Sequence, residues 1–443
     1  MGALSHLRVL DLSRVLAGPW ASQLLADLGA EVIKIERPGL GDDTRGWGPP
    51  WIDDPQWGDV AQSAYFAGVN RNKKSVAVDI ATPDGQRLVA ALAVQCDVLI
   101  ENFKVGGLRA YGLDYDTLKR SHPGLVYCSI TGFGQDGPYA GRPGYDFLVQ
   151  GMGGLMSITG RSDGEPGAGP LKVGVALTDI LTGLYATAGI QAALAHRDRS
   201  GVGQHVDVAL LDVQVAALAN QAMNFLASGR EPSRLGNAHP NIVPYQDFAT
   251  LDGHIIVTIG NDAQFRRFCG AIGRPDLADD PRYETNTARL AARESLIPQI
   301  QAAMARHASA HWLQTLEALA VPCGPINGLA DVFADPQVLQ RGMRVPMPGA
   351  QAGGAELVGN PLHLSATPVE YRSAPPALGA HTEPVLREML GLAPQALAEL
   401  RRTGAIAAGS RAVHTTRSDK GDPPWNHPPS KRKIRSGPPG GGC

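Results

Sequence analysis

The chain has 443 residues, of which 43% are hydrophobic and 19% charged, so it is long enough to bury a large core in two or three domains. Its formal net charge of −2 argues against a nucleic-acid partner, and the absence of a run of 18 apolar residues argues against a membrane partner. Five scattered cysteines without CxxC spacing predict neither a zinc site nor a disulfide framework, and they favour a reducing, cytoplasmic setting.

The first half of the chain alternates β-rich runs with helical patterns. Strands are predicted over residues 7–13, 30–36, 75–80, 97–102 and 125–134, with helices after Pro19 and over 83–95. Strands separated by helices indicate βαβ units, so the predicted fold class is α/β with a Rossmann-like parallel sheet. No GxGxxG follows the first strand, so the dinucleotide-binding fingerprint is absent.

The second half begins with a long helical pattern over 179–196 and an apolar run from 205 to about 227, read as a strand followed by a helix. Asp252-Gly253 between two β-rich runs predicts a hairpin over 248–260, and helical patterns follow at 264–272, 291–306 and 311–319. We therefore predict four parts: 1–227 begins a large Rossmann-like domain, 228–325 forms a small α+β domain, 326–409 returns to the large domain, and 410–443 is a tail.

The tail is rich in Pro, Gly and Ser, and it carries seven Lys or Arg against two Asp. It contains too few apolar residues to fold alone, so we expect it to be disordered. The KRKIR run at 431–435 is of a kind that can bind nucleic acid or direct targeting, but a solvated tail is the simpler interpretation.

Asp179 is the one carboxylate in the bland stretch LKVGVALTDILTG, and it stands at the predicted start of a helix. One interpretation is an N-cap, which typically contributes about 1 kcal/mol. The other uses the same location, because a helix N-terminus stabilises an anion and an ionised carboxylate in a dry cleft is a nucleophile. The small residues that follow, Gly183, Ala186, Gly189, Ala192 and Ala193, would let a large substrate approach. From the residues alone, both interpretations stay open.

Basic and aromatic residues recur near strand ends, and ligands of open α/β sheets bind outside the carboxyl ends of the strands. An anionic, nucleotide-like ligand that needs an aromatic stacking partner would fit them, although each charge taken singly is more often a solvated surface residue. A later loop, GNAHPN, offers Asn237 and His239 as acceptor-site candidates, and a structural turn histidine is the alternative. The strand-end residues are Arg37, Arg71, Lys73, Lys74, Asn102, Phe103, Lys104 and Arg109.

The stretches VLDLSRVLAGPWASQLLADLGAEVIKIERPGLGDDTR, NRNKKSVAVDI, DVLIENF, GYDFLVQGMGG, SGVGQHVDVALLD and LGAHTEPVL, with the Asp179 segment, resemble the class III CoA-transferases. This family includes formyl-CoA transferase, carnitine CoA-transferase and α-methylacyl-CoA racemase. The resemblance spans about residues 7–390. It implies that Asp179 is the catalytic aspartate, that two chains form an interlocked ring-like homodimer, and that the large domain binds coenzyme A. The expected coenzyme A contacts are Val15, Arg37, Arg71, Asn72, Lys73, Asn102, Phe103, Arg109, Arg142 and Tyr145.

The resemblance is imperfect at several positions. Arg109 stands next to Ala110, which aligns with an arginine of formyl-CoA transferase, and Arg142 stands next to Pro143, which aligns near a lysine. The GNAHPN loop replaces the family's glycine-rich catalytic loop. We therefore expect a succinyl-CoA-like donor and a dicarboxylate acceptor rather than formate or oxalate. The coenzyme A thioester would be a substrate, with no permanently bound cofactor and no metal.

Two alternatives to CoA transfer remain. The racemases carry a GHD motif whose histidine supplies an acid or base, and this chain has Tyr145 there. Because a tyrosine with its ordinary pKa near 10 is a poor base at neutral pH, transfer is favoured over racemisation. A non-catalytic CoA-binding protein is the other alternative, and Asp179 with its small neighbours argues against it.

Overall fold

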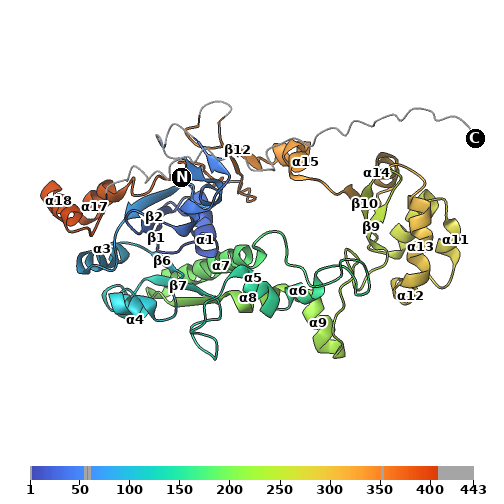
Figure 1. The fold of residues 1–443 in the computed structure, drawn as a ribbon, viewed down its shortest axis with the longest axis horizontal. Helices are drawn as coiled ribbons and strands as arrows, with labels where there is room; N and C mark the ends of the chain where they lie inside the picture. The colour runs from blue at the N-terminus through green and yellow to red at the C-terminus, as the bar shows by residue number, and fades with distance from the viewer. Residues whose placement is uncertain (1, 54–56, 58–60, 351–353, 408–443) are drawn as a thin grey trace, which may run out of the picture.

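A computed structural model describes residues 2–53, 57, 61–350 and 354–407. Its centre is a six-stranded sheet in which all neighbouring strands are parallel, in the order β5-β2-β1-β6-β7-β8 (Figure 1). The strands are β1 (Arg8–Asp11), β2 (Glu31–Glu36), β5 (Lys73–Ala77), β6 (Val98–Glu101), β7 (Val126–Thr131) and β8 (His205–Ala209). The predicted α/β class with a parallel sheet is confirmed.

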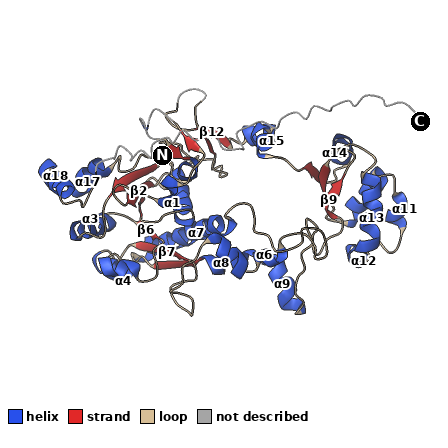
Figure 2. Cartoon of the chain, in the orientation of Figure 1, coloured by secondary structure: helices blue, strands red, loops and turns tan. Residues whose placement is uncertain are grey.

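Helices cover both faces of this sheet, as parallel sheets require (Figure 2). One face packs against α1 (Ala17–Asp27), α5 (Asp146–Met152), α7 (Leu177–Ser200) and α8 (Leu210–Ala217). The other packs against α3 (Pro83–Val94), α4 (Tyr115–Ser121), α17 (Thr382–Leu390) and α18 (Pro394–Arg402). Each face buries its own hydrophobic cluster, so the sheet lies between two cores.

The long helix α7 lies directly against α1. At Gly183, a Cβ atom would be 2.7 Å from the Ala17 carbonyl oxygen, so only glycine allows this separation of the two helices. The close approach fixes the first turns of α7 relative to the loop that leaves β1. It thereby places the helix that carries Asp179.

Several short elements lie in the connections between these strands and helices or follow them in the chain. They are η1 (Asp43–Gly46), β3 (Trp51–Ile52), β4 (Gln62–Ser63), α2 (Ala64–Ala67), η3 (Gly107–Tyr111), α6 (Leu155–Ile158) and α9 (Ala219–Ser228).

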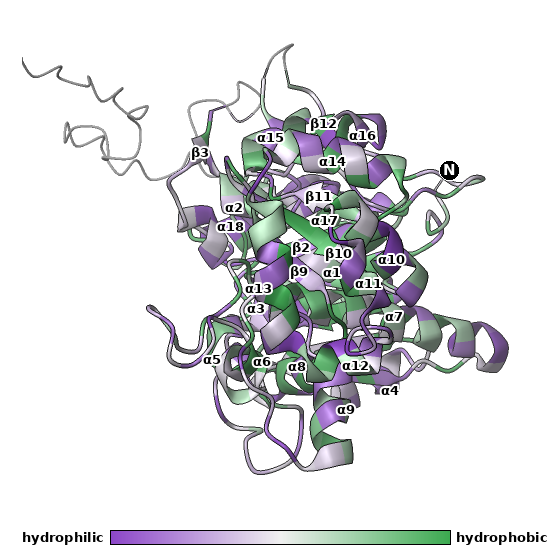
Figure 3. Cartoon of the chain, turned by 90° about the vertical axis from the view of Figure 1, so that its right-hand side faces the viewer, coloured by the Kyte–Doolittle hydropathy of each residue, from purple (hydrophilic) through white to green (hydrophobic). Residues whose placement is uncertain are grey.

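A second unit lies to the right of the sheet in Figure 1 and has its own core between Val243 and Val321. The predicted hairpin is confirmed, since β9 (Tyr245–Ala249) and β10 (His254–Thr258) pair antiparallel. The strand β11 (Cys323–Pro325) completes its sheet. Its helices are α10 (Asp262–Ala271), α11 (Pro275–Asp279), α12 (Asn286–Ala291), α13 (Arg293–Met304) and α14 (Ser309–Ala318). Figure 3 looks onto this unit and shows hydrophilic stretches along α10.

The chain then returns through α15 (Leu329–Ala334), α16 (Pro336–Gln340), β12 (Arg344–Pro346) and β13 (Glu356–Val358). Helices α17 and α18 pack on the large sheet, and Ala407 N–H donates to the Ala77 carbonyl at 3.2 Å. The division of the chain at 227, 325 and 409 stays a prediction. The predicted tail at 410–443 lies outside the residues that the structure describes.

Candidate active site

Asp179 lies in the first turn of α7 but does not cap it. The N-cap position is Ala176, whose side chain makes no capping hydrogen bond. The Asp146 carboxylate, from α5, takes that role: its Oδ1 accepts from Thr178 N–H at 2.8 Å and from Asp179 N–H at 3.2 Å. The N-cap interpretation of Asp179 is therefore wrong, and its partly buried carboxylate is available for another role.

The surroundings of Asp179 disfavour its ionised form. Burial, and secondly the Asp146 carboxylate, raise the pKa of Asp179 to about 7. We expected the helix N-terminus to keep this group ionised, but desolvation and a neighbouring negative charge outweigh that effect. The ionised carboxylate is therefore poorly stabilised in this site, which is the condition of a reactive group near neutral pH.

A tyrosine stands close to the two carboxylates. Burial raises the pKa of Tyr65, in α2, to about 12, and the charges of Asp179, Asp146 and Asp42 add to this shift. The edge of the Trp47 ring meets the Tyr65 ring at a centroid distance of 5.2 Å. Tyr65 therefore stays neutral at physiological pH, and its phenol is within the electrostatic influence of Asp179.

The loop after β1 is joined to the loop after β6. Asn102 accepts from the Arg14 N–H at 3.0 Å and donates to the Arg14 carbonyl at 2.7 Å, and the Arg14 guanidinium lies 5.9 Å from the Phe103 ring centre. Val15 adopts a φ of 73°, a strained value for a β-branched residue, and its N–H donates to Asp42 at 3.2 Å. The structure thus brings Val15, Asn102 and Phe103 together at the carboxyl ends of β1 and β6.

A buried ionic cluster holds the loop that follows β1. The side chains of Lys34 and Asp42 are fully buried and 2.9 Å apart, and Lys34 Nζ also donates to the Ser13 carbonyl at 2.7 Å. Burial opposes the charge on Lys34, but Asp42, Asp11 and Glu36 raise the pKa of this ammonium above its ordinary value. Lys34 was not among the predicted site residues, although a lysine inside the apolar run EVIKIE is the signal that could have identified it.

The predicted coenzyme A contacts in the NRNK stretch lie in the interior. Arg71 forms a bidentate ion pair with Asp27 at 2.9 and 2.6 Å, and Asn72 donates to the same carboxylate at 2.9 Å. Lys73 Nζ donates to the Pro19 carbonyl and to Asn70 Oδ1, both at 2.9 Å. All three side chains are buried and occupied by protein partners, so this geometry favours a structural role and does not support direct contact with a ligand.

The remaining cationic candidates are exposed. Arg37 follows β2, Arg109 lies in η3, and Arg142 packs its guanidinium over the Tyr139 ring at 4.6 Å. Tyr145 precedes α5 and is 67% exposed, so its phenol is free to meet a substrate or a second chain.

The two acceptor-site candidates lie with the second unit. Asn237 donates to Asp247 at 3.1 Å, and the ring of His239 lies 5.1 Å from that of Tyr245. His239 Nδ1 accepts from Asn241 N–H at 3.0 Å, and burial together with Arg293 lowers its pKa, so the ring is neutral with its proton on Nε2. Figure 1 places β9, which Asp247 and Tyr245 occupy, across the molecule from α7. Within one chain the structure does not bring His239 to Asp179.

Known proteins resemble this chain over most of its length. The model of "CoA-transferase family III" matches residues 4–382. A "Succinate--glutarate CoA-transferase" of Agrobacterium fabrum is 52% identical, covering 87% of this chain and 95% of that protein. A human "Succinyl-CoA:glutarate CoA-transferase" is 43% identical over 91% of this chain and 90% of its own length. A solved CAIB/BAIF family protein from Brucella suis has 48% identity and a TM-score of 0.77, covering 88% of this chain and 99% of that chain.

The chain belongs to CoA-transferase family III. It is an enzyme that transfers coenzyme A, and coenzyme A thioesters are the substrates of this family.

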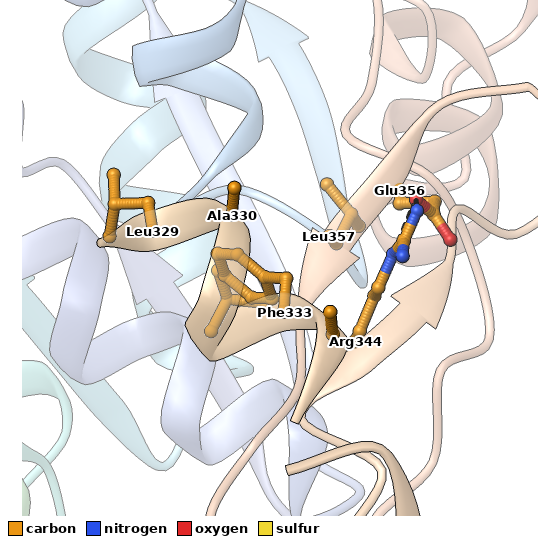
Figure 4. A pocket seen from close by; sticks show the side chains of 8 residues that line it. Leu329, Ala330, Phe333, Arg344, Glu356 and Leu357 are labelled. Carbon is orange, nitrogen blue, oxygen red and sulfur yellow. Dashed lines mark hydrogen bonds and ion pairs between the residues drawn. The ribbon is translucent and has the colours of Figure 1, made fainter. Parts of the chain in front are cut away.

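A cavity in the described part of this CoA-transferase lies away from Asp179. It measures about 560 Å³ and lies between α15 and the β12–β13 hairpin, where the Arg344–Glu356 ion pair stands beside apolar side chains (Figure 4). Its lining contains none of the predicted site residues. The lining residues are Leu329, Ala330, Phe333, Ala334, Arg344, Glu356, Leu357 and Val358.

The described residues of the CoA-transferase contain no group of three or more His, Cys, Asp or Glu side chains arranged to hold a metal ion. No helix among them is long and apolar enough to cross a membrane. The four cysteines in this part, Cys96, Cys128, Cys269 and Cys323, are free thiols.

Proposed function

We propose that this enzyme moves coenzyme A from succinyl-CoA to glutarate, or to a dicarboxylate of similar length, through a covalent aspartyl-CoA thioester on Asp179. The observation that carries the proposal is the Asp179 carboxylate, which is partly buried and does not cap its helix, in a chain 52% identical to a succinate–glutarate CoA-transferase. Relatives from mouse and human carry the same pair of substrates in their names.

The chemistry needs only carboxylates and a thiolate. The Asp179 carboxylate attacks the thioester carbonyl of succinyl-CoA, which gives a mixed succinyl-aspartyl anhydride and releases the CoA thiolate. The thiolate then attacks the Asp179 carbonyl, which forms aspartyl-CoA and frees succinate. Glutarate reverses the two steps: it attacks aspartyl-CoA, and the thiolate released attacks the glutaryl carbonyl, so glutaryl-CoA leaves and the Asp179 carboxylate is restored. Each exchange swaps one carboxylate for another, so we propose no resident cofactor and no metal.

For coenzyme A, we propose a site formed by Val15, Asn102 and Phe103. The Val15 and Asn102 loops are held together by hydrogen bonds before any ligand binds, which reduces the entropy that binding must spend on ordering them. Arg37, with Arg109 and Arg142, would supply positive charge to the phosphates of coenzyme A.

For the acceptor site, we propose that a second chain supplies Asn237 and His239 within an interlocked ring-like homodimer. The second unit is joined to the sheet by two separate lengths of chain, one outgoing after α9 and one returning into α15 (Figure 1). Large apolar side chains stand exposed on four neighbouring helices, as expected of a surface that a partner covers. They are Phe147, Leu148 and Met152 of α5, Leu184 and Tyr185 of α7, Val215 of α8, and Met223, Phe225 and Leu226 of α9.

Light scattering tests the dimer. The chain should elute with the mass of two copies, and Leu226→Asp, which puts a charge on a side chain that is 71% exposed in one copy, should yield monomers with little activity. A wild-type chain that is monomeric and fully active would contradict the proposal.

Asp179→Ala and Asp179→Asn test the nucleophile. Both variants should lose transfer from succinyl-CoA to glutarate while keeping a wild-type circular dichroism spectrum and affinity for coenzyme A. Wild-type enzyme incubated with succinyl-CoA should gain the mass of coenzyme A, less water, on the peptide that contains Asp179, and hydroxylamine should convert that residue to a hydroxamate. Full activity in Asp179→Ala would end the proposal.

Deuterium exchange separates transfer from racemisation. A racemase would exchange the α-proton of a 2-methylacyl-CoA in deuterated water, which a transferase of this design does not do.

We propose a cytoplasmic location, which suits the four free thiols.

A further inference from the structure

One oxygen of the Asp146 carboxylate accepts hydrogen bonds from the start of α7, and the other accepts one from its own helix, α5. Its Oδ1 accepts from the N–H groups of Thr178 and Asp179, and its Oδ2 accepts from Gln150 Nε2 at 2.6 Å. The carboxylate therefore reaches from α5 to the backbone of the very residue proposed as nucleophile. No interpretation of the sequence assigned a role to this residue.

Gln150 extends the same attachment toward the segment that enters α7. It is fully buried, its Oε1 accepts from Val173 N–H at 3.0 Å, and its Nε2 also reaches the Val175 carbonyl at 3.4 Å. One turn of α5 thus fixes the chain from Val173 to Asp179. Loss of Asp146 would release two backbone N–H groups at the end of a helix and loosen this segment.

The groups that face Asp179 come from several elements. Tyr65 of α2, which responds to the Asp179 charge, stays neutral, and next to Asp179 the hydroxyl of Thr178 donates to the neutral amide of Gln214 of α8 at 2.6 Å. Among the residues that the structure describes, the charge with a resolved effect on Asp179 is that of Asp146. Asp42 acts on the same tyrosine but is paired with Lys34.

We propose that Asp146 is a positioning residue that fixes the first turn of α7 and, through its negative charge, controls the protonation of the neighbouring Asp179 carboxylate. The proposal rests on the proposed function for the role of Asp179 as nucleophile. The Asp179 anion is destabilised beside Asp146. Formation of the mixed anhydride, and then of the aspartyl-CoA thioester, removes the negative charge of Asp179 and so relieves this repulsion. Asp146 would thus both position Asp179 and favour the covalent intermediates that form on it.

Asp146→Asn in the full chain tests this directly, because asparagine keeps an oxygen for the two N–H groups and loses the charge. The titration midpoint of the Asp179 carboxyl can be followed by carbon NMR with carboxyl-labelled aspartate, its signal identified by its absence in Asp179→Asn. We expect the midpoint to fall by about one pH unit or more, as expected on removal of a neighbouring like charge. The pH at half-maximal kcat/KM should fall in parallel.

The control is Asp116→Asn in α4, which makes the same charge change at an exposed carboxylate paired with Lys119. It should leave the Asp179 midpoint unchanged. If Asp146→Asn does not fold, Asp146→Ser supplies a neutral cap that tests the same shift. A midpoint unchanged in the folded variant overturns the proposal. Because the NMR titration needs no turnover, an enzyme that failed to transfer between succinyl-CoA and glutarate would refute the proposed function without touching this result.

Discussion

Replacing Asp179 by asparagine should stabilise the enzyme at alkaline pH, at the expense of its activity. The pKa of this carboxyl is about 7 in the folded chain and near its ordinary value of 3.8 in the unfolded chain. The folded state binds the proton more tightly than the unfolded state. The contribution of this proton to the free energy of unfolding is therefore fully present below about pH 4, falls as the pH rises toward 7, and is absent above it. Asparagine carries no charge at any pH, so it escapes this loss.

The magnitude follows from the shift. About three pKa units correspond to about 4 kcal/mol at pH 8, and partial exposure of Asp179 reduces this to about 2 kcal/mol. At pH 5, where the folded carboxyl is still protonated, the expected gain is about 1 kcal/mol or less. The free energy of unfolding of Asp179→Asn should therefore exceed that of the wild type by an amount that grows with pH.

Urea unfolding at a fixed protein concentration, at pH 5 and at pH 8, measures this difference, with Asp116→Asn as the matched charge control. Fixed concentration is needed because a dimer unfolds in a concentration-dependent way. A variant that is equally or less stable than the wild type at pH 8, or a gain that shrinks with pH, would refute the reasoning that the site holds Asp179 at an energetic cost.

Three further results are expected. The wild-type kcat/KM should rise with pH through about 7 as Asp179 ionises, which a buffer series with succinyl-CoA would measure. Gly183→Ala should lower the melting temperature by several degrees and reduce kcat, because its Cβ would clash with α1, whereas Gly270→Ala, where a Cβ meets open space, should not. Lys34→Met should cost about 3–5 kcal/mol in urea unfolding by leaving Asp42 buried without its partner, and Lys34→Met with Asp42→Asn should recover part of it.

The parallel sheet could be predicted because its signals are local. Runs such as VIKIE and VLIE are short, apolar and bounded by turns, and the helices between them have clear beginnings and ends. The hairpin of β9 and β10 was predictable for the same reason, since Asp252-Gly253 announces its turn.

The contacts of the NRNK stretch could not be predicted, because its partners are distant in sequence. Asp27 stands 44 residues before Arg71, and the Glu370 carbonyl that accepts from Asn72 stands almost 300 residues after it. A basic run in a sequence looks like a surface patch until the fold shows which carboxylates lie beside it.

The chemistry expected of Asp179 depends on the same kind of long-range placement. The sequence indicated that Asp179 stands at the start of a helix. It did not indicate which residue caps that helix, because the capping carboxylate, Asp146, comes from α5, 33 residues earlier. The separation of α7 from α1 is set by Gly183, and the negative charge beside the proposed nucleophile comes from Asp146 of α5. Both helices thus act on one carboxylate: α1 fixes how closely α7 packs, while Asp146 of α5 holds the first turn of α7 and adds to the effect of burial on the Asp179 pKa. A family motif can transfer the identity of such a residue between proteins, whereas its reactivity has to be read from the helices packed around it.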